Sequence, residues 1–222
     1  GPVLYEWHTS RSAKCLDGML TGFAGQVQCD GYGAYTHFAG EHKEITLFGC
    51  WAHARRKIFE ARQEAPAFAD WVLRQIGHLY RIEREADEAG TVPTLRQVRR
   101  AAESRMILNR LHRVFVGKVA SFLPRSQLGR ALAYALKRWP ELERYLAHGH
   151  VRIDNNGVEN AIRPTAVGKK NWLFIGHPEA GDRSAILYTI IMNCKRCGIN
   201  PAIYLRDVLT QLPALTNQQI AD

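Results

Sequence analysis

Apolar and polar residues alternate with two different periods along this chain. Residues 3–8 alternate as in a half-buried strand, and residues 26–29 and 45–50 are short apolar runs that also favour strands. Residues 12–23 have helical spacing instead. From residue 52 the helical period takes over and continues to residue 148. The pattern predicts strands near the N-terminus, followed by a long helical middle.

Prolines divide the helical middle into separate helices. Pro93 is placed to open a helix, Pro124 to end it, and Pro140 to stop or restart the next one. Because strand signals stop before residue 51 and an acidic motif appears after residue 150, we expect a mixed α/β fold with a helical insertion. The expected parts are residues 1–51 and 149–222, which form one core, and residues 52–148, which interrupt it.

Composition is that of a soluble globular chain. The 222 residues are 46% hydrophobic and 23% charged, with no run of 18 apolar residues, so we expect no membrane partner. Five cysteines, an odd number, favour reduced thiols and a cytoplasmic location over a disulfide framework.

Positive charge is concentrated in the middle of the chain. The formal net charge is +9, and residues 52–148 carry 19 Lys and Arg against 10 Asp and Glu, whereas the remainder is balanced. Most of these cations are arginines, whose guanidinium groups bind two phosphate oxygens at once. The segment therefore suits contacts with nucleic-acid phosphates, although a solvated helix surface explains the same charges.

Two carboxylates stand where a metal-dependent site is often built. Asp30 ends the short strand of residues 26–29, and Glu159 opens a helical segment beside Asn155, Asn156 and Arg163. Two such carboxylates can share divalent metal ions. Each also has a simpler explanation, because Asp30 and Gly31 form a common turn pair, and Asn156 and Glu159 have the spacing of a capping box.

Several longer motifs, taken in order, resemble one family. They run from Gln28 to Tyr32, Gly49 to Lys57, Asp154 to Pro164, Gly168 to Gly176, Ala185 to Tyr188, Gly198 to Pro201 and Tyr204 to Leu209. Together they resemble the transposases of the insertion sequence 66 family. The resemblance spans nearly the whole chain.

The resemblance implies a ribonuclease H-like core with a catalytic triad of two aspartates and one glutamate. Asp30 matches the second aspartate and Glu159 the glutamate, so both are expected metal ligands. The first aspartate has no match, and Asp17 falls in a helical run where the family places no catalytic group. We therefore expect an N-terminally incomplete core with weak or absent catalysis alone. Gly1 and Pro2 are compatible with the remnant of a cleaved tag on a fragment and with a native start.

The resemblance also marks candidate DNA contacts. His53, Arg55 and Arg56 follow the strand of residues 45–50, although ordinary surface cations at a helix start explain them too. Asn155, Asn156 and Arg163 flank Glu159, where they are expected to orient metal-bound oxygens or grip the DNA backbone. Lys169, Lys170 and Trp172 lie in an expected loop and strand, and Trp172 could equally be a core residue.

These features predict the catalytic region of a DNA transposase. It would use a two-metal Mg²⁺ or Mn²⁺ site for strand cleavage and for strand transfer to target DNA, acting on insertion-sequence ends as a homo-oligomer. The alternative is a non-catalytic DNA-binding or assembly fragment of a transposase. A ribonuclease is a third possibility, since the expected core serves several nuclease substrates.

Overall fold

The computed structural model describes residues 1–10, 12–172 and 175–215, with Trp172 as backbone only. The protein is mixed but mostly helical, and its residues form two compact units. We call residues 12–156 the central unit, and residues 1–11 with 157–222 the terminal unit. Among the described residues, no helix has the length and apolarity needed to cross a membrane.

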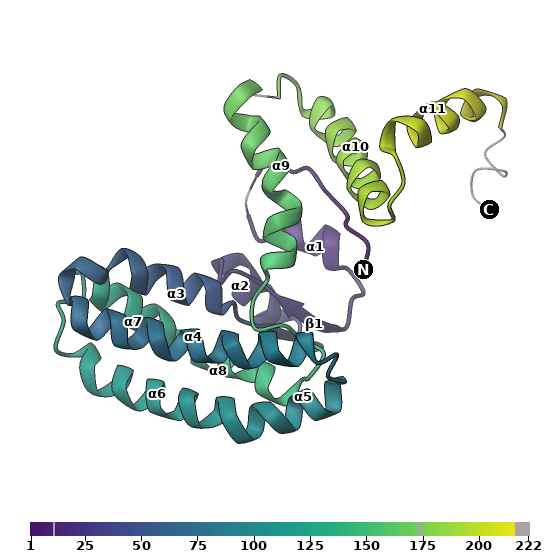
Figure 1. The fold of residues 1–222 in the computed structure, drawn as a ribbon. Helices are drawn as coiled ribbons and strands as arrows, with labels where there is room; N and C mark the ends of the chain where they lie inside the picture. The colour runs from purple at the N-terminus through teal and green to yellow at the C-terminus, as the bar shows by residue number, and fades with distance from the viewer. Residues whose placement is uncertain (11, 173–174, 216–222) are drawn as a thin grey trace. The chain divides into compact units, whose positions relative to one another are not determined.

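The central unit contains both strands of the described chain and most of its helices (Figure 1). Its elements are α1 (Lys14–Leu20), β1 (Gly25–Gln28), α2 (Gly33–Glu41), β2 (Ile45–Phe48), α3 (Trp51–Glu60), the 3-10 helix η1 (Arg62–Glu64), α4 (Pro66–Glu88), α5 (Pro93–Arg99), the π-helix η2 (Arg100–Ser104), α6 (Arg105–Val119), α7 (Gln127–Lys137), α8 (Trp139–Glu143) and the 3-10 helix η3 (Arg144–Ala147).

Strands β1 and β2 pair in parallel, with Gly25 opposite Ile45 and Gln28 opposite Phe48. Helix α2 connects them, because parallel strands need a crossover rather than a hairpin. A small apolar cluster that includes Leu16 and Phe38 packs α1 and α2 against the strands. The carboxyl ends of both strands therefore lie at the same edge of the sheet.

Helices α3, α4, α6 and α7 enclose the larger core of the central unit. Trp51, which begins α3, is completely buried and donates its indole N–H to the carbonyl oxygen of Leu142 at 2.8 Å. Its ring meets that of Trp139 edge to face. The predicted helical middle is confirmed, and Pro93 opens α5 as expected, because the apolar three- and four-residue spacing places one face of each helix in this core.

The terminal unit contains α9 (Asn156–Trp172), whose first residue is the last of the central unit, then α10 (Pro178–Arg196), α11 (Pro201–Gln211) and the 3-10 helix η4 (Leu212–Ala214). The expected strand over residues 3–8 is wrong. This segment is not paired with a strand, since it bonds side chains of α10 instead: the amide of Val3 donates to Asn193 and that of Tyr5 to Thr189, each at 2.9 Å.

Candidate functional site

Asp30 stands in a tight turn directly after β1. Its carboxylate is exposed, and Oδ1 accepts the backbone N–H of Tyr32 at 2.8 Å. Gly31 makes the turn with a φ of +87°, a conformation that side chains with a Cβ rarely adopt. The turn explanation and the functional one are therefore compatible, because only one carboxylate oxygen is used by the turn and the group still faces solvent.

Two side chains of the helical region hold this turn in place. The Tyr134 hydroxyl on α7 donates to the carbonyl oxygen of Asp30 at 3.0 Å, and Arg138 donates to that of Gly31 at 2.7 Å. Burial raises the pKa of Tyr134 to about 12, so the hydroxyl stays a donor at neutral pH. Sequence reasoning missed both residues, which read as ordinary members of an amphipathic helix.

A second carboxylate, Asp154, lies in the loop before α9 and is buried, with 8% of its surface exposed. Its Oδ2 accepts the Tyr80 hydroxyl and the Asn156 side-chain amide, both at 2.8 Å, and its Oδ1 accepts the Asn156 backbone N–H at 3.1 Å. Burial and the neighbouring carboxylate raise the pKa of Tyr80 far above its usual value. The expected capping box is therefore replaced, because Asp154 rather than Asn156 supplies the acceptor at this helix start.

The start of α3 lies beside the same loop. The Trp51 amide donates to the carbonyl oxygen of Ile153 at 3.2 Å, and the Cys50 thiol contacts the backbone N–H of Asn155. His53 places Nδ1 3.2 Å from the Cys50 sulfur. Burial raises the pKa of Cys50, so this thiol is an apolar neighbour of His53 rather than a nucleophile.

An open cavity of about 390 Å³ lies between α3 and α4, and we call it the α3 pocket. It is lined by Ala52, Arg55, Arg56, Phe59, Tyr80 and Asn156. Arg55, Arg56 and Asn156 were all predicted DNA contacts, and the fold brings them to this one cavity. Phe59 and Tyr80 were not predicted, because an aromatic residue at helical spacing is usually a core residue.

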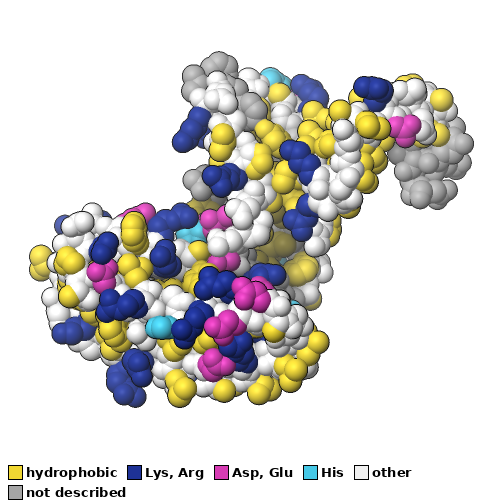
Figure 2. Space-filling model, viewed as in Figure 1, with side chains coloured by type: hydrophobic (Ala, Val, Ile, Leu, Met, Phe, Trp, Pro, Cys, Tyr) yellow, Lys and Arg dark blue, Asp and Glu magenta, His cyan; other side chains and the backbone are white. Residues whose placement is uncertain are grey.

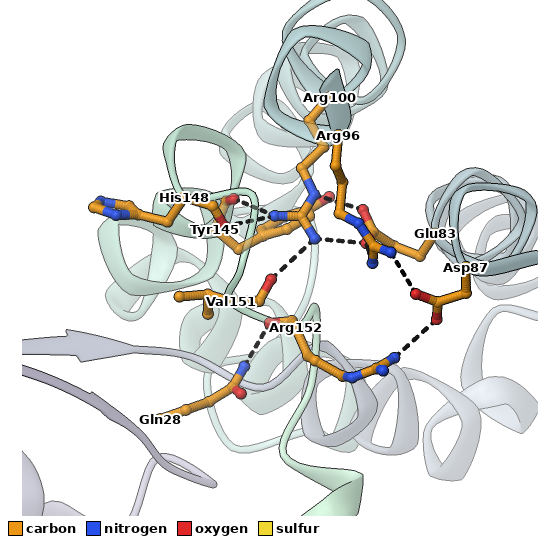
Figure 3. A network of polar contacts seen from close by, with 9 residues as sticks. All are labelled: Gln28, Glu83, Asp87, Arg96, Arg100, Tyr145, His148, Val151 and Arg152. Atoms are coloured by element: carbon orange, nitrogen blue, oxygen red, sulfur yellow. Dashed lines mark hydrogen bonds and ion pairs between the residues drawn. The ribbon is translucent and has the colours of Figure 1, made fainter. Parts of the chain in front are cut away.

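A buried arginine fixes the segment that leads into the Asp154 loop (Figure 3). Arg100, in η2, is 0% exposed. All its guanidinium donors are used, on Glu83 at 2.6 and 2.7 Å and on the carbonyl oxygens of Tyr145, His148 and Val151 at 2.7 to 2.9 Å. Arg100 is therefore unavailable to DNA, unlike the exposed cations of residues 52–148.

The same segment is tied to β1. Gln28, the last residue of β1, donates its amide to the carbonyl oxygen of Arg152 at 2.7 Å, and Arg152 pairs with Asp87 at 2.8 Å (Figure 3). At Gly149, a Cβ would meet the carbonyl oxygen of Pro93 at 1.7 Å, so the chain passes α5 too closely for any side chain. The Asp30 turn and the Asp154 loop are thus both anchored to the helical region.

The other predicted site residues belong to α9. Glu159 and Arg163 are one turn apart, as expected, and Arg163 is exposed. Lys169 and Lys170 are exposed in the last turn of α9, so the expected loop and strand at these residues is wrong, because the helix continues past Pro164 to Trp172. The side chain of Trp172 lies outside the described residues.

The fold thus groups the predicted residues into two sets. Asp30, His53, Arg55, Arg56, Asn155 and Asn156 belong to the central unit, while Glu159, Arg163, Lys169 and Lys170 belong to the terminal unit. The central set lies on three neighbouring features: the Asp30 turn, the start of α3 and the Asp154 loop. In this set, the exposed carboxylate of Asp30 is the group that can bind a hard cation, since Mg²⁺ prefers oxygen ligands.

Comparison with known proteins gives one family and several relatives. The family model described as "Transposase IS66 family" matches residues 2–183. The uncharacterized protein y4qI of Sinorhizobium fredii is 34% identical over 95% of this chain, and y4jD of the same organism is 30% identical over 95% of it. The chain spans 40% of y4qI and 42% of y4jD. No solved structure matches.

Proposed function

Because this chain belongs to the IS66 transposase family, we propose that it is the catalytic region of a DNA transposase. The proposed reaction is in-line phosphoryl transfer, first to water during strand cleavage and then to a 3′-hydroxyl during strand transfer. The observation that carries the proposal is the exposed Asp30 carboxylate at the carboxyl end of a parallel strand, held from behind by Tyr134 and Arg138.

The proposal includes a ribonuclease H-like core, of which β1, α2 and β2 form a part. A parallel strand-helix-strand unit with a carboxylate after its first strand supports it, because ligand sites in parallel sheets gather at the carboxyl ends of the strands. The division into a core of residues 1–51 and 149–222 with an insertion of residues 52–148 stays a prediction. It describes the order of the family's segments, whereas the two units here are defined by contacts.

Asp30 and Glu159 are the proposed ligands of Mg²⁺ or Mn²⁺. The fit is supported at Asp30, whose Oδ2 has no hydrogen-bond partner among the described residues, so an oxygen remains for a cation. When bound, the metal ions would neutralise the phosphate and lower the pKa of a bound water. Asp30 itself is kept in place by its turn, which limits the reorganisation that binding would cost.

Charged and amide side chains have the proposed role of gripping DNA. Arg55 and Arg56 would bind phosphates at the α3 pocket, and Arg163, Lys169 and Lys170 would do so along α9. Their exposure supports this assignment, because a phosphate contact needs a guanidinium or ammonium group that solvent can reach. Asn155 and Asn156 would orient the bound oxygens or the helix start, and the contact of the Asn155 backbone N–H with the Cys50 thiol supports this by fixing the Asp154 loop.

A nicking assay tests the catalytic proposal. Supercoiled DNA that carries insertion-sequence ends is incubated with the chain and Mg²⁺ or Mn²⁺, at protein concentrations high enough to detect slow turnover. We expect metal-dependent nicks that Asp30→Asn and Glu159→Gln abolish. The matched control is Asp17→Asn, an exposed aspartate on α1, which should leave nicking unchanged. Nicking that survives Asp30→Asn would refute the assignment.

The second candidate is a non-catalytic DNA-binding or assembly part of a transposase. It is favoured by the charge of the insertion, 19 Lys and Arg against 10 Asp and Glu over residues 52–148, which spreads over the face of the central unit seen in Figure 2. Salt-sensitive DNA binding without any metal-dependent nick would select this candidate over the enzyme. Homo-oligomer formation on paired ends is part of both proposals.

A further inference from the structure

We propose that the α3 pocket binds a single unpaired nucleotide of DNA, with its base against Phe59 and its phosphate between Arg55 and Arg56. The inference rests on the proposed function, because it assumes that DNA is the partner. It adds a site that recognises a local state of the DNA, an unpaired base, rather than a sequence or the backbone alone.

The size of the cavity fits one nucleotide. Its volume of about 390 Å³ is at the lower end of the roughly 300 to 1,000 Å³ typical of small-molecule sites. A base with its sugar and phosphate fits a cavity of this size, whereas a run of several nucleotides needs an extended groove. The cavity is open on one side, so a base turned out of a duplex can enter without the protein unfolding.

An exposed aromatic ring marks the pocket as a stacking platform. Phe59 is 54% exposed although it lies on a helix whose other large apolar residues, Trp51 and Ile58, are fully buried. An exposed ring gains contact area when a base stacks on it, and every base has a flat face that can do so. We therefore expect binding to depend on the presence of an unpaired base more than on its identity.

Charge in the pocket has the right sign for a phosphate. Arg55 and Arg56 lie one turn before Phe59 on α3, so the cations and the ring share one side of the helix. Among the described residues, those that line the cavity include no carboxylate. Asp154, in the adjoining loop, is buried and bonds Tyr80 and Asn156 with its two oxygens.

The pocket wall is also rigid. Tyr80 is fixed by its hydrogen bond to Asp154. Asn156 is fixed by two hydrogen bonds to the same carboxylate, one from its side-chain amide and one from its backbone N–H. A site whose walls are held by buried hydrogen bonds loses little conformational freedom when a ligand enters. This preorganisation separates the α3 pocket from a chance gap between surface side chains.

A binding experiment with two matched DNAs tests the inference. One is a fully paired duplex, the other the same duplex with one extra unpaired nucleotide in its centre, both end-labelled and titrated by fluorescence anisotropy at several salt concentrations. We expect tighter binding of the bulged DNA. Phe59→Ala should lower that affinity by about 5- to 100-fold and leave paired-duplex binding and the salt dependence unchanged, because it removes stacking without charge.

Controls separate stacking from folding and from charge. Phe59→Trp should keep the preference for bulged DNA, since a larger ring still stacks. Val116→Ala, at a position of α6 that is also 54% exposed, should change neither affinity. Arg55→Ala or Arg56→Ala should weaken the binding of both DNAs and reduce the slope of log affinity against log salt concentration by about one. Thermal melts check that each variant is folded.

Two results would overturn the inference. The first is an equal affinity of the wild-type chain for both DNAs, and the second is an equal loss of affinity for both DNAs after Phe59→Ala. Either result shows that the pocket does not bind an unpaired nucleotide. If metal-dependent nicking still depends on Asp30, the transposase proposal survives that outcome. A wild-type chain that binds neither DNA at any salt concentration refutes the proposed function together with this inference.

Discussion

Gly31 is the residue that permits the position of Asp30. Its φ of +87° is unfavourable for any residue with a Cβ, and an added Cβ would lie 2.5 Å from the Tyr134 hydroxyl oxygen. We expect Gly31→Ala to reduce the free energy of unfolding by about 1 to 3 kcal/mol, because backbone strain adds to the lost Tyr134 contact. Urea denaturation measures the loss.

Gly33→Ala is the matched control for this change. Gly33 begins α2 two residues later, and a Cβ there would meet nothing within 4 Å. Because alanine favours a helix over glycine, this variant should be neutral or slightly more stable. Equal destabilisation by both changes would show that the Asp30 turn does not depend on the special conformation of Gly31.

A partly buried histidine ring, that of His148, makes stability depend on pH. Burial, His150 and Arg144 lower the pKa of His148 below its usual value near 6.5. The neutral ring is therefore favoured in the folded state, and its contribution is complete above pH 6.5 and is lost as the pH falls toward the lowered pKa. We expect urea stability to fall between pH 7.5 and 5.5, and His148→Gln to remove part of that fall. His37→Gln, on the exposed side of α2, should leave it unchanged.

Sequence reasoning found the residues whose types are unusual for their position, and missed those whose roles depend on distant partners. Asp30 and the arginine pair of α3 stand out as polar groups beside apolar runs. Tyr134 and Arg138 do not, because their partners lie more than 100 positions away along the chain. Asp154 begins one of the family motifs, but its hydrogen bond with Tyr80 could not be predicted, because the two residues meet only once α4 has folded.

Among the elements, the π-helix η2 begins at a fully buried side chain, that of Arg100. A π-turn displaces the helical register, and here it accompanies a fully buried Arg100 whose guanidinium pairs with Glu83. We expect Arg100→Met to cost about 3 to 5 kcal/mol of unfolding free energy, because it leaves Glu83 charged and buried with too few partners. Denaturation monitored by circular dichroism measures the loss.

A double variant and a surface control test the cause of that loss. Adding Glu83→Leu to Arg100→Met should recover a part of the stability, since the buried carboxylate, left with only Arg96 as an ion-pair partner, is then gone. Arg99→Ala, next to Arg100, removes ion pairs with Glu85 and Glu103 at the surface and should cost no more than about 1 kcal/mol. If Arg99→Ala and Arg100→Met cost the same, the buried network is not what stabilises this segment.

Elements with a strong helical period were predictable, and extended ones were only partly so. The helices of residues 52–148 follow from their apolar spacing, because each packs one face into a shared core. Alternation over residues 3–8 predicted a strand, whereas the amides of Val3 and Tyr5 bond side chains of α10. At Lys169 the aromatic residues that follow suggested a strand, whereas the helix simply continues.

For the whole molecule, the two units differ in how much they bury. Among described residues, the terminal unit buries only Ala161, Gly181 and Cys194, whereas the central unit encloses two apolar clusters. Buried apolar surface is the main source of stability, so we expect the terminal unit to unfold at a lower denaturant concentration. The positions of the five cysteines allow this to be measured directly.

Thiol labelling in increasing urea should reveal the difference. Exposed Cys197 should react at once in native protein. Cys194 should become reactive at a lower urea concentration than Cys29 and Cys50, which are buried in the central unit and whose pKa values burial raises. Mass spectrometry of labelled peptides assigns each site. Simultaneous exposure of all three buried thiols would show a single cooperative transition instead.

The close passage at Gly149 has a consequence for how chains of this kind can change in length. Since the backbone at Gly149 passes so close to Pro93, this point tolerates neither a side chain nor a shift. The connection from α6 to α7 contains a second close passage, because a Cβ on Gly129 would lie 2.2 Å from the carbonyl oxygen of Leu123. Natural additions and deletions, and any grafted tag or fluorophore, should therefore be rejected at both of these passages.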